Sequence, residues 1–172
     1  VYLNTQAIEK AAFTLNLVYH YRAWYREALD VFEKAMRALE DEEQHGRALA
    51  LTTITLGWFY LRFGQMADAE EVFEKAQILF HKLNFTPMAQ AQEPLIGLGL
   101  VAVSRGDYAK AAQVSEQGCR DCEARGDIID LPFTYFMPWA SAMQAQGDYQ
   151  AAKQYAQHGC AIARSQNLIW FL

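Results

Sequence analysis

Cysteines and long apolar runs are both scarce in this sequence, and each scarcity excludes a class of protein. Three cysteines among 172 residues are too few, and odd in number, for a disulfide framework, so they predict reduced thiols in a cytoplasmic protein. The longest apolar stretch, from Pro94 to Val103, has about ten residues, whereas a helix that spans a bilayer needs about 20. We therefore expect no transmembrane segment and no membrane partner.

Positive charge is scarce as well. Lys and Arg total 15 against 20 Asp and Glu, which gives a formal net charge of -5. The cations are scattered singly, so no basic face is evident that could neutralise phosphates. We expect no direct binding of nucleic acid.

Recognisable catalytic arrangements are missing too. No histidine has a Ser, Cys or carboxylate recurring beside it in a catalytic order. The four histidines are His20, His45, His81 and His158. Gly97-Leu98-Gly99 lacks the Gly and Lys that complete a phosphate loop and lies in a helical pattern, so it is better interpreted as close helix packing. The sequence therefore predicts a protein that is not an enzyme and holds no cofactor.

What the sequence does contain is an internal repeat, which decides the architecture. Two segments that begin at Tyr25 and Met66, 41 residues apart, align without gaps, and both contain Val-Phe-Glu-Lys-Ala. A third and a fourth copy follow around Tyr108 and Tyr149, again 41 residues apart. Four units of 41–42 residues fill nearly the whole chain.

The marked residues of each copy have helical spacing. In the second copy they are Ala69, Phe73 and Ala76, and the spacing i, i+4, i+7 places them on one helix face. Small residues at two of three positions let a partner helix approach closely, while the Phe fills the remaining gap. This face predicts the second helix of a helical hairpin.

Glycines and aspartates mark the expected helix ends. Gly64 and Gly106 suit the left-handed conformation that follows a helix C-terminus. Asp107 and Asp148 suit N-caps, because a carboxylate accepts hydrogen bonds from the first free amides of a helix.

These residues resemble the tetratricopeptide repeat family, whose pattern is Leu-Gly, then Tyr, then Ala, Phe and Ala at fixed later places. The second unit matches best, through Leu56, Gly57, Tyr60, Ala69, Phe73 and Ala76. The period exceeds the family's usual period of about 34, and His81 and Glu123 stand where the family has Pro. Helices about one turn longer are implied. Such repeats look like those in the sensor regions of maltose-activator-like ATP-dependent regulators.

The resemblance implies an all-α fold, a right-handed α-solenoid of four tetratricopeptide-like helix-turn-helix repeats in one domain over residues 1–172. The repeats are expected near residues 5–43, 47–84, 88–125 and 131–166. Their eight helices are expected near 5–22, 25–43, 47–63, 66–84, 88–105, 108–125, 131–146 and 149–166.

Pro138 falls inside the seventh expected helix. Proline removes a backbone donor and clashes with the carbonyl of Thr134, so a kink or break is expected there. The kink is either a local irregularity of a degenerate repeat or the opening of a pocket beside Trp139.

Cys119 and Cys122 form a C-x-x-C pair, and His158 and Cys160 lie near one another in the next unit. Cys119 and Cys160 follow a Gly at equivalent repeat positions, which indicates a packing residue copied by duplication. A zinc site usually presents its cysteines from turns, which a pair inside a helix does poorly. We expect buried thiols that act as small apolar residues and no metal, with a zinc site as the alternative.

The resemblance also implies that the first helices of the repeats line a concave groove. Its inward positions in this sequence are Phe13, Leu17, His20, Tyr21, Ile54, Trp58, Arg62, Glu93, Ile96, Leu100, Met137, Ser141 and Gln144. Such an apolar groove suits an amphipathic helix, an extended peptide or a medium-sized ligand. We expect Trp58 as an apolar anchor, with Arg62 and Glu93 orienting polar ends. The alternative is that Trp58 is buried between hairpins and Arg62 pairs with a carboxylate.

Two functions are consistent with these expectations. One is a scaffold that binds a protein or peptide, or other domains of its own chain, as the regulatory region of a larger signalling or transcription-regulatory protein. The other is a sensor that accepts a small molecule or signalling peptide in the groove. Because the chain opens with Val-Tyr-Leu-Asn rather than Met, we interpret it as a fragment of a multidomain protein. The apolar end from Leu168 to Leu172 predicts self-association.

Overall fold

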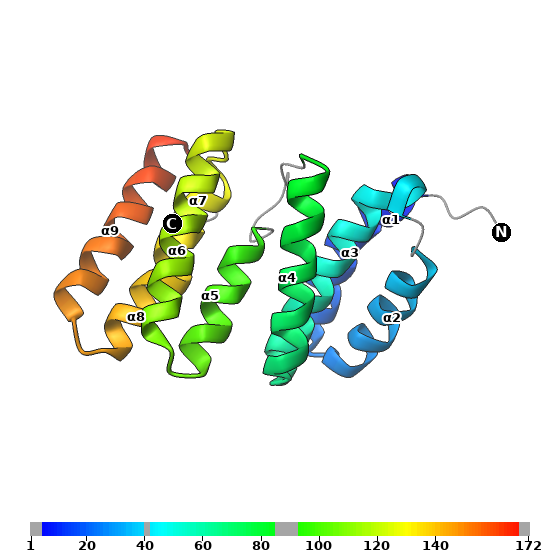
Figure 1. Ribbon diagram of the computed structural model, residues 1–172, viewed down its shortest axis with the longest axis horizontal. Helices are drawn as coiled ribbons and strands as arrows, with labels where there is room; N and C mark the ends of the chain where they lie inside the picture. The colour runs from blue at the N-terminus through cyan, green and yellow to red at the C-terminus, as the bar shows by residue number, and fades with distance from the viewer. Residues whose placement is uncertain (1–4, 40–41, 85–92, 169–172) are drawn as a thin grey trace. The chain divides into compact units, whose positions relative to one another are not determined.

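The computed structural model describes residues 5–39, 42–84 and 93–168, and every regular element in these ranges is a helix. The all-α fold class is therefore confirmed. The chain divides into two compact units, Val1–Phe85 and Thr86–Leu172, each of which contains two of the predicted hairpins (Figure 1). Within the described residues, no helix is long and apolar enough to cross a membrane.

The described residues of unit 1 (Val1–Phe85) form four helices that agree closely with the predicted ones. They are α1 (Thr5–Arg22), α2 (Tyr25–Ala38), α3 (Glu42–Phe63) and α4 (Met66–Lys82). The prediction was wrong at two ends, because α2 stops before residue 43 and α3 begins before residue 47. Buried Leu39 ends α2. Gly46 lies inside α3 rather than at its edge, and a Cβ there would sit 2.9 Å from a methyl of Leu83.

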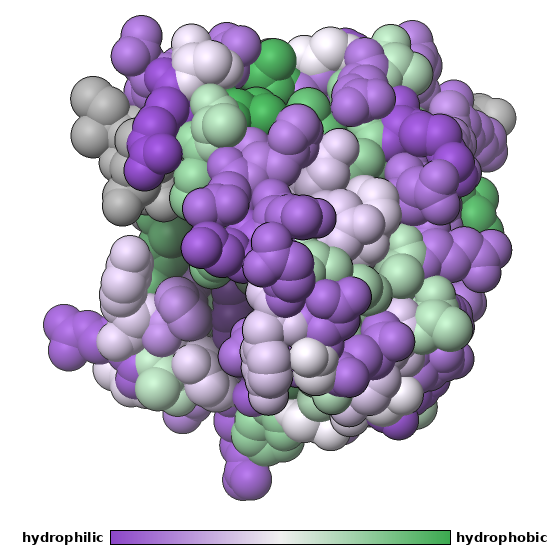
Figure 2. Space-filling view, turned by 90° about the vertical axis from the view of Figure 1, so that its left-hand side faces the viewer, coloured by the Kyte–Doolittle hydropathy of each residue, from purple (hydrophilic) through white to green (hydrophobic). Residues whose placement is uncertain are grey.

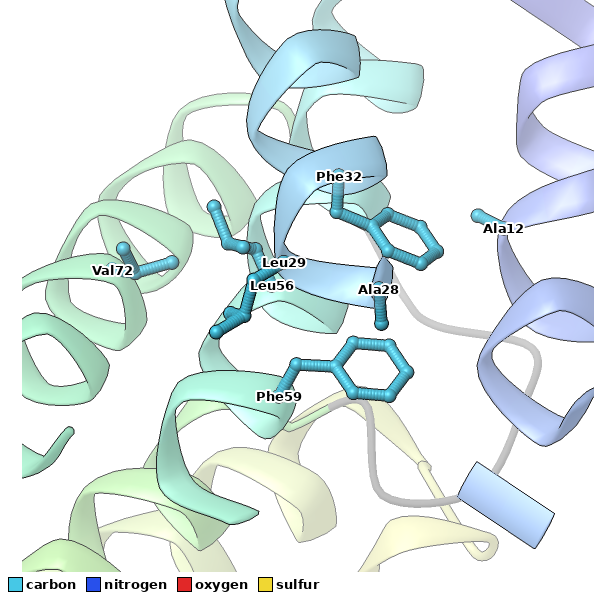
Figure 3. Packing of buried hydrophobic residues seen from close by; sticks show 7 residues of the cluster. All are labelled: Ala12, Ala28, Leu29, Phe32, Leu56, Phe59 and Val72. Atoms are coloured by element: carbon cyan, nitrogen blue, oxygen red, sulfur yellow. The ribbon is translucent and has the colours of Figure 1, made fainter. Parts of the chain in front are cut away.

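The core of unit 1 is built around stacked aromatic rings from α2 and α3 (Figure 3). The rings of Phe32 and Phe59 lie 5.5 Å apart at 25°, and Tyr19 of α1 meets both edge-on. Ala28, beside them, is fully buried. Ala28 and Phe32 occupy the repeat positions of Ala69 and Phe73, so the packing face predicted for the second helices is present on α2.

The second predicted face, on α4, is confirmed as well. Ala69, Phe73 and Ala76 have exposed fractions of 0%. Phe73 lies directly over Gly57 of α3, where a Cβ would come within 2.7 Å of its ring. Leu-Gly in one helix and Phe in the next are therefore complementary, because the missing side chain makes room for the ring.

Unit 2 (Thr86–Leu172) also contains two helical hairpins. Its elements are α5 (Pro94–Ser104), α6 (Tyr108–Arg125), α7 (Asp130–Thr134), the π-helical turn η1 (Tyr135–Trp139), α8 (Ala140–Ala145) and α9 (Tyr149–Ser165). The expected start of the fifth helix near residue 88 lies outside the described residues. In the structure α5 begins at Pro94, with Glu93 as its N-cap and a side-chain oxygen that accepts from the Leu95 amide.

The predicted helix ends are confirmed. The carboxylate of Asp107 accepts from the amide of Lys110 at 3.0 Å, and Asp148 accepts from Ala151 at 2.9 Å. Gly64 and Gly106 have φ angles of 87° and 78°, which a residue with a side chain adopts only with strain.

Pro138 produces a π-helical turn rather than a break. The amide of Ala140 donates to the carbonyl of Tyr135, five residues back, and this wider turn accommodates a residue without an amide proton. Pro138 packs on α5 at Gly99, where a Cβ would lie 2.5 Å from the Pro138 Cβ. The Gly97-Leu98-Gly99 segment is thus part of helix packing, as the sequence interpretation favoured.

The α3–α4 contact generates a stability prediction. Phe73→Ala should lower the free energy of unfolding by about 3 to 5 kcal/mol, because it leaves a cavity above Gly57. Ala69→Leu should lower it by about 1 to 3 kcal/mol through overpacking. Ala67→Leu, at an exposed position of the same helix, is the control and should change little. Thermal melting measures all three, and unchanged midpoints for the first two variants would contradict the packing described.

Candidate functional site

A cleft of about 460 Å³ opens to solvent in unit 2, between α9 and the helical segment η1–α8. Leu100 of α5 also contributes to its wall. The lining residues are Leu100, Phe136, Met137, Ala140, Ser141, Gln144, Tyr149, Ala152, Lys153 and Ala156. Figure 2, seen from the side on which α9 lies, shows mostly hydrophilic residues interrupted by smaller groups of hydrophobic ones.

The cleft combines an apolar floor with an aromatic and polar rim. Small side chains such as Ala152 and Ala156 from α9 let the two walls approach, whereas Phe136 and Tyr149 stand at the edge with exposed fractions of 49% and 70%. Lys153 supplies a positive charge at the α9 wall. This arrangement suits an apolar side chain or helix face with polar groups around it.

Four of the sequence-predicted groove residues come together here, namely Leu100, Met137, Ser141 and Gln144. The residues contributed by α9 were missed, because the resemblance assigns second helices to the opposite surface. The sequence feature that could have indicated this wall is the pair of small residues one helical turn apart on α9, Ala152 and Ala156. The sequence left open whether the Pro138 kink is a local irregularity or opens a pocket beside Trp139. Trp139 does not line this cleft, and its ring stacks on Tyr155, 4.3 Å away.

Three predicted groove residues lie on the surface of α1 in unit 1. Leu17 and Tyr21 have exposed fractions of 38% and 81%, and His20 is also exposed. The ring of His20 lies 5.6 Å from that of Tyr21. Phe13 belongs to α1, but its side chain lies outside the described residues.

Four other predicted groove residues are interior, and this corrects their assignment to an accessible surface. Ile54, Trp58, Glu93 and Ile96 have exposed fractions of 1%, 6%, 3% and 0%. The ring of Trp58 packs edge-on against Phe73 at 5.5 Å. The same helix positions can serve a groove or helix packing, and the spacing alone does not distinguish the two. Trp58 is therefore not an exposed anchor. Its burial agrees with the alternative interpretation.

Among the described residues Arg62 pairs with no carboxylate, so this part of the alternative stays a prediction. Its Nη1 donates to the Asn16 side-chain oxygen at 3.3 Å, and its guanidinium lies 5.5 Å from the centre of the Trp58 ring.

Glu93 forms interactions inside unit 2 and is not exposed to bind a ligand. Its carboxylate forms an ion pair with Arg125 of α6, and burial raises its pKa while the Arg125 charge acts in the opposite direction. Asp127, two residues after Arg125, accepts from the amides of Ile129 and Asp130 at 3.1 and 3.0 Å. The buried carboxylates thus fix the starts of α5 and α7.

Cys119 and Cys122 are buried side chains of α6, with exposed fractions of 4% and 0%, and Cys160 is half-buried. Burial raises the pKa of the Cys119 thiol to about 12, although a hydrogen bond from Tyr135 acts in the opposite direction. Burial also raises the pKa of Cys122. In the described part of the chain, no three His, Cys, Asp or Glu side chains are grouped to hold a metal.

Comparison with known family models finds no match, and comparison with curated proteins finds none either. Among solved structures, the chain is similar to the crystal structure of BtubC (BKLC) from P. vanneervenii, with a TM-score of 0.67 and 18% sequence identity. The similarity covers 95% of this chain and 66% of BtubC, so the chain spans about two thirds of that protein. At this identity the likeness shows the helical fold alone.

The buried ion pair predicts a non-additive mutational effect. Arg125→Met should lower the free energy of unfolding by about 3 kcal/mol, because it leaves the Glu93 charge buried without its partner. Adding Glu93→Gln, which keeps an oxygen for the α5 cap, should restore much of this loss. Arg120→Met removes an exposed pair with Glu116 and should cost less than about 1 kcal/mol. Urea denaturation measures each value; simple additivity of the two changes would contradict a buried pair.

Burial of the thiols predicts their order of reaction. With a thiol-specific disulfide reagent at about pH 8, near the pKa of a free thiol, Cys160 should react first. Cys119 and Cys122 should react only as the protein unfolds. Mass spectrometry of the labelled peptides identifies each site, and equal rates at all three thiols would show that α6 is not packed as described.

Proposed function

We propose that this chain is a tetratricopeptide-like helical repeat that acts as a scaffold, binding an apolar face of a protein or peptide in the cleft of unit 2. In this proposal the four hairpins are successive repeats of an α-solenoid. The chain would then be the regulatory region of a larger signalling or transcription-regulatory protein, as its resemblance to maltose-activator-like regulators implies.

The observation that carries the proposal is the composition of the open cleft. Exposed Phe136 and Tyr149 at its rim are the kind of side chain that dominates binding energy at protein interfaces. The alanines of α9 leave room for a partner's side chains, as small residues do where a helix lies in a groove. An open apolar cleft suits a partner that covers it from outside.

A small-molecule or signalling-peptide sensor is the second candidate, and the size of the cleft favours it. A volume of about 460 Å³ falls within the roughly 300–1,000 Å³ of ligand pockets. Ser141, Gln144 and Lys153 could orient the polar groups of such a ligand.

Peptide selection tests the scaffold. Amphipathic helical peptides chosen from a display library for binding to the whole chain should lose at least about tenfold in affinity on Ala156→Glu, which places a charge in the cleft. Ala161→Glu, at an exposed position of the same helix, is the matched control and should bind normally. Fluorescence polarisation with labelled peptides measures both.

The two candidates give different results. Peptides that bind equally to both variants would contradict the cleft as the site. Failure to select any peptide, together with an apolar fluorescent dye that binds the chain and is displaced by Ala156→Glu, would favour the sensor.

A further inference from the structure

Unit 1 carries a polar site that the cleft does not involve, centred on Arg62 at the end of α3. Its guanidinium is half-buried and lies over the rings of Trp58 and Phe59, 5.5 and 5.6 Å from their centres. Within the described residues, its Nη1 donates a hydrogen bond to the Asn16 side-chain oxygen at 3.3 Å. No Asp or Glu of the described residues pairs with it.

Among the residues that the structure describes, this positive charge has no carboxylate counter-ion. Arginine stays protonated in proteins and offers five N–H donors in a rigid plane. Its position over two aromatic rings is a favourable cation–π arrangement that restricts the guanidinium. Because a half-buried guanidinium is poorly hydrated, an arriving carboxylate gains more from it than from an exposed lysine.

Neighbouring groups are compatible with an anion. Asn16 uses its oxygen toward Arg62, so its amide N–H₂ group remains as a donor. His20 is close enough that Arg62 lowers its pKa, after burial as the larger cause. The rings of Tyr21 and Tyr25 lie 5.6 and 6.4 Å from the ring of His20.

Exposed apolar and aromatic side chains also occur on α1 and at the end of α3, the two helices that supply Asn16 and Arg62. Leu17 and Tyr21 of α1 are 38% and 81% exposed, and Phe63, directly after Arg62, is 43% exposed. Trp24, between α1 and α2, is 48% exposed. Arg26 lies 6.0 Å from the centre of the Phe63 ring, so the surrounding surface is aromatic and cationic.

We propose that Arg62 and Asn16 bind a side-chain carboxylate of Asp or Glu from a protein segment that also packs apolar side chains on Tyr21 and Phe63. Charge complementarity identifies the acidic group, because the guanidinium pairs with no carboxylate of the described residues. A segment bound through a side-chain carboxylate continues past it in both directions, so it can reach both Tyr21 of α1 and Phe63 of α3, whereas a chain terminus ends at its carboxylate. The site is separate from the unit 2 cleft and does not depend on it.

Three blocked dipeptides test the proposal on the whole chain by NMR titration. The acidic probe is acetyl-Phe-Glu-amide, its neutral twin is acetyl-Phe-Gln-amide, and acetyl-Phe-Gln with a free carboxyl end represents a chain terminus. The acidic probe should shift the His20 ring and Trp58 indole signals and bind at least about tenfold more tightly than its neutral twin.

Variants locate the preference. Arg62→Gln should abolish it, while Arg62→Lys, which keeps the charge but loses the planar fork, should keep part of it. Arg37→Gln is the control, since Arg37 is an exposed arginine of the same unit that already pairs with Glu33 at 3.7 Å. Ala156→Glu, which tests the cleft, should leave the preference unchanged.

Three results would overturn the proposal. They are equal binding of the acidic and neutral probes, signal shifts confined to residues away from α1 and α3, and an unchanged preference in a folded Arg62→Gln variant. Tighter binding of the free-terminus probe than of the acidic probe would overturn the assignment to a side chain. Helical circular dichroism confirms that each variant is folded, and the wild-type shift map decides the site if Arg62→Gln does not fold.

Discussion

Close approach of helix backbones is the constraint on which each unit depends. A Cβ at Gly57 would come within 2.7 Å of the Phe73 ring, and one at Gly99 would come within 2.5 Å of the Pro138 Cβ. At Gly159 the obstacle would be the backbone carbonyl oxygen of Pro132, 2.9 Å away. Since rigid rings and backbone cannot yield cheaply, glycine at these positions decides how near one helix lies to the next.

The cleft follows from the same constraint. Pro138 sits on Gly99 inside a π-helical turn, and the residues around this turn, among them Phe136 and Met137, form one wall of the cleft. The other wall belongs to α9, which is held close through Gly159. The proposed binding surface therefore depends on the helix contacts at Gly99 and Gly159, although neither glycine lines the cleft.

The helices, their ends and their packing faces could be predicted from the sequence, because these features are local. The Asp107 cap and the face through Ala69 and Phe73 follow from spacing and residue type. Burial of Glu93 could not be predicted, because its partner Arg125 lies on another helix and no local pattern marks the pair. The α9 wall of the cleft was missed for a similar reason: which helix faces the η1 turn is decided by tertiary packing. The single domain remains a prediction. Self-association through the apolar C-terminal end also remains a prediction, since most of that end lies outside the described residues.

Glycine-to-alanine substitution tests the constraint most directly, since inside a helix this change ordinarily stabilises by about 1 kcal/mol. Gly46 is the reference, because a Cβ there would meet only the movable methyl groups of Leu83. The account predicts that Gly57→Ala and Gly99→Ala lower the free energy of unfolding measured by urea denaturation, whereas Gly46→Ala leaves it unchanged or raises it. An equal gain in stability from all three substitutions would contradict it.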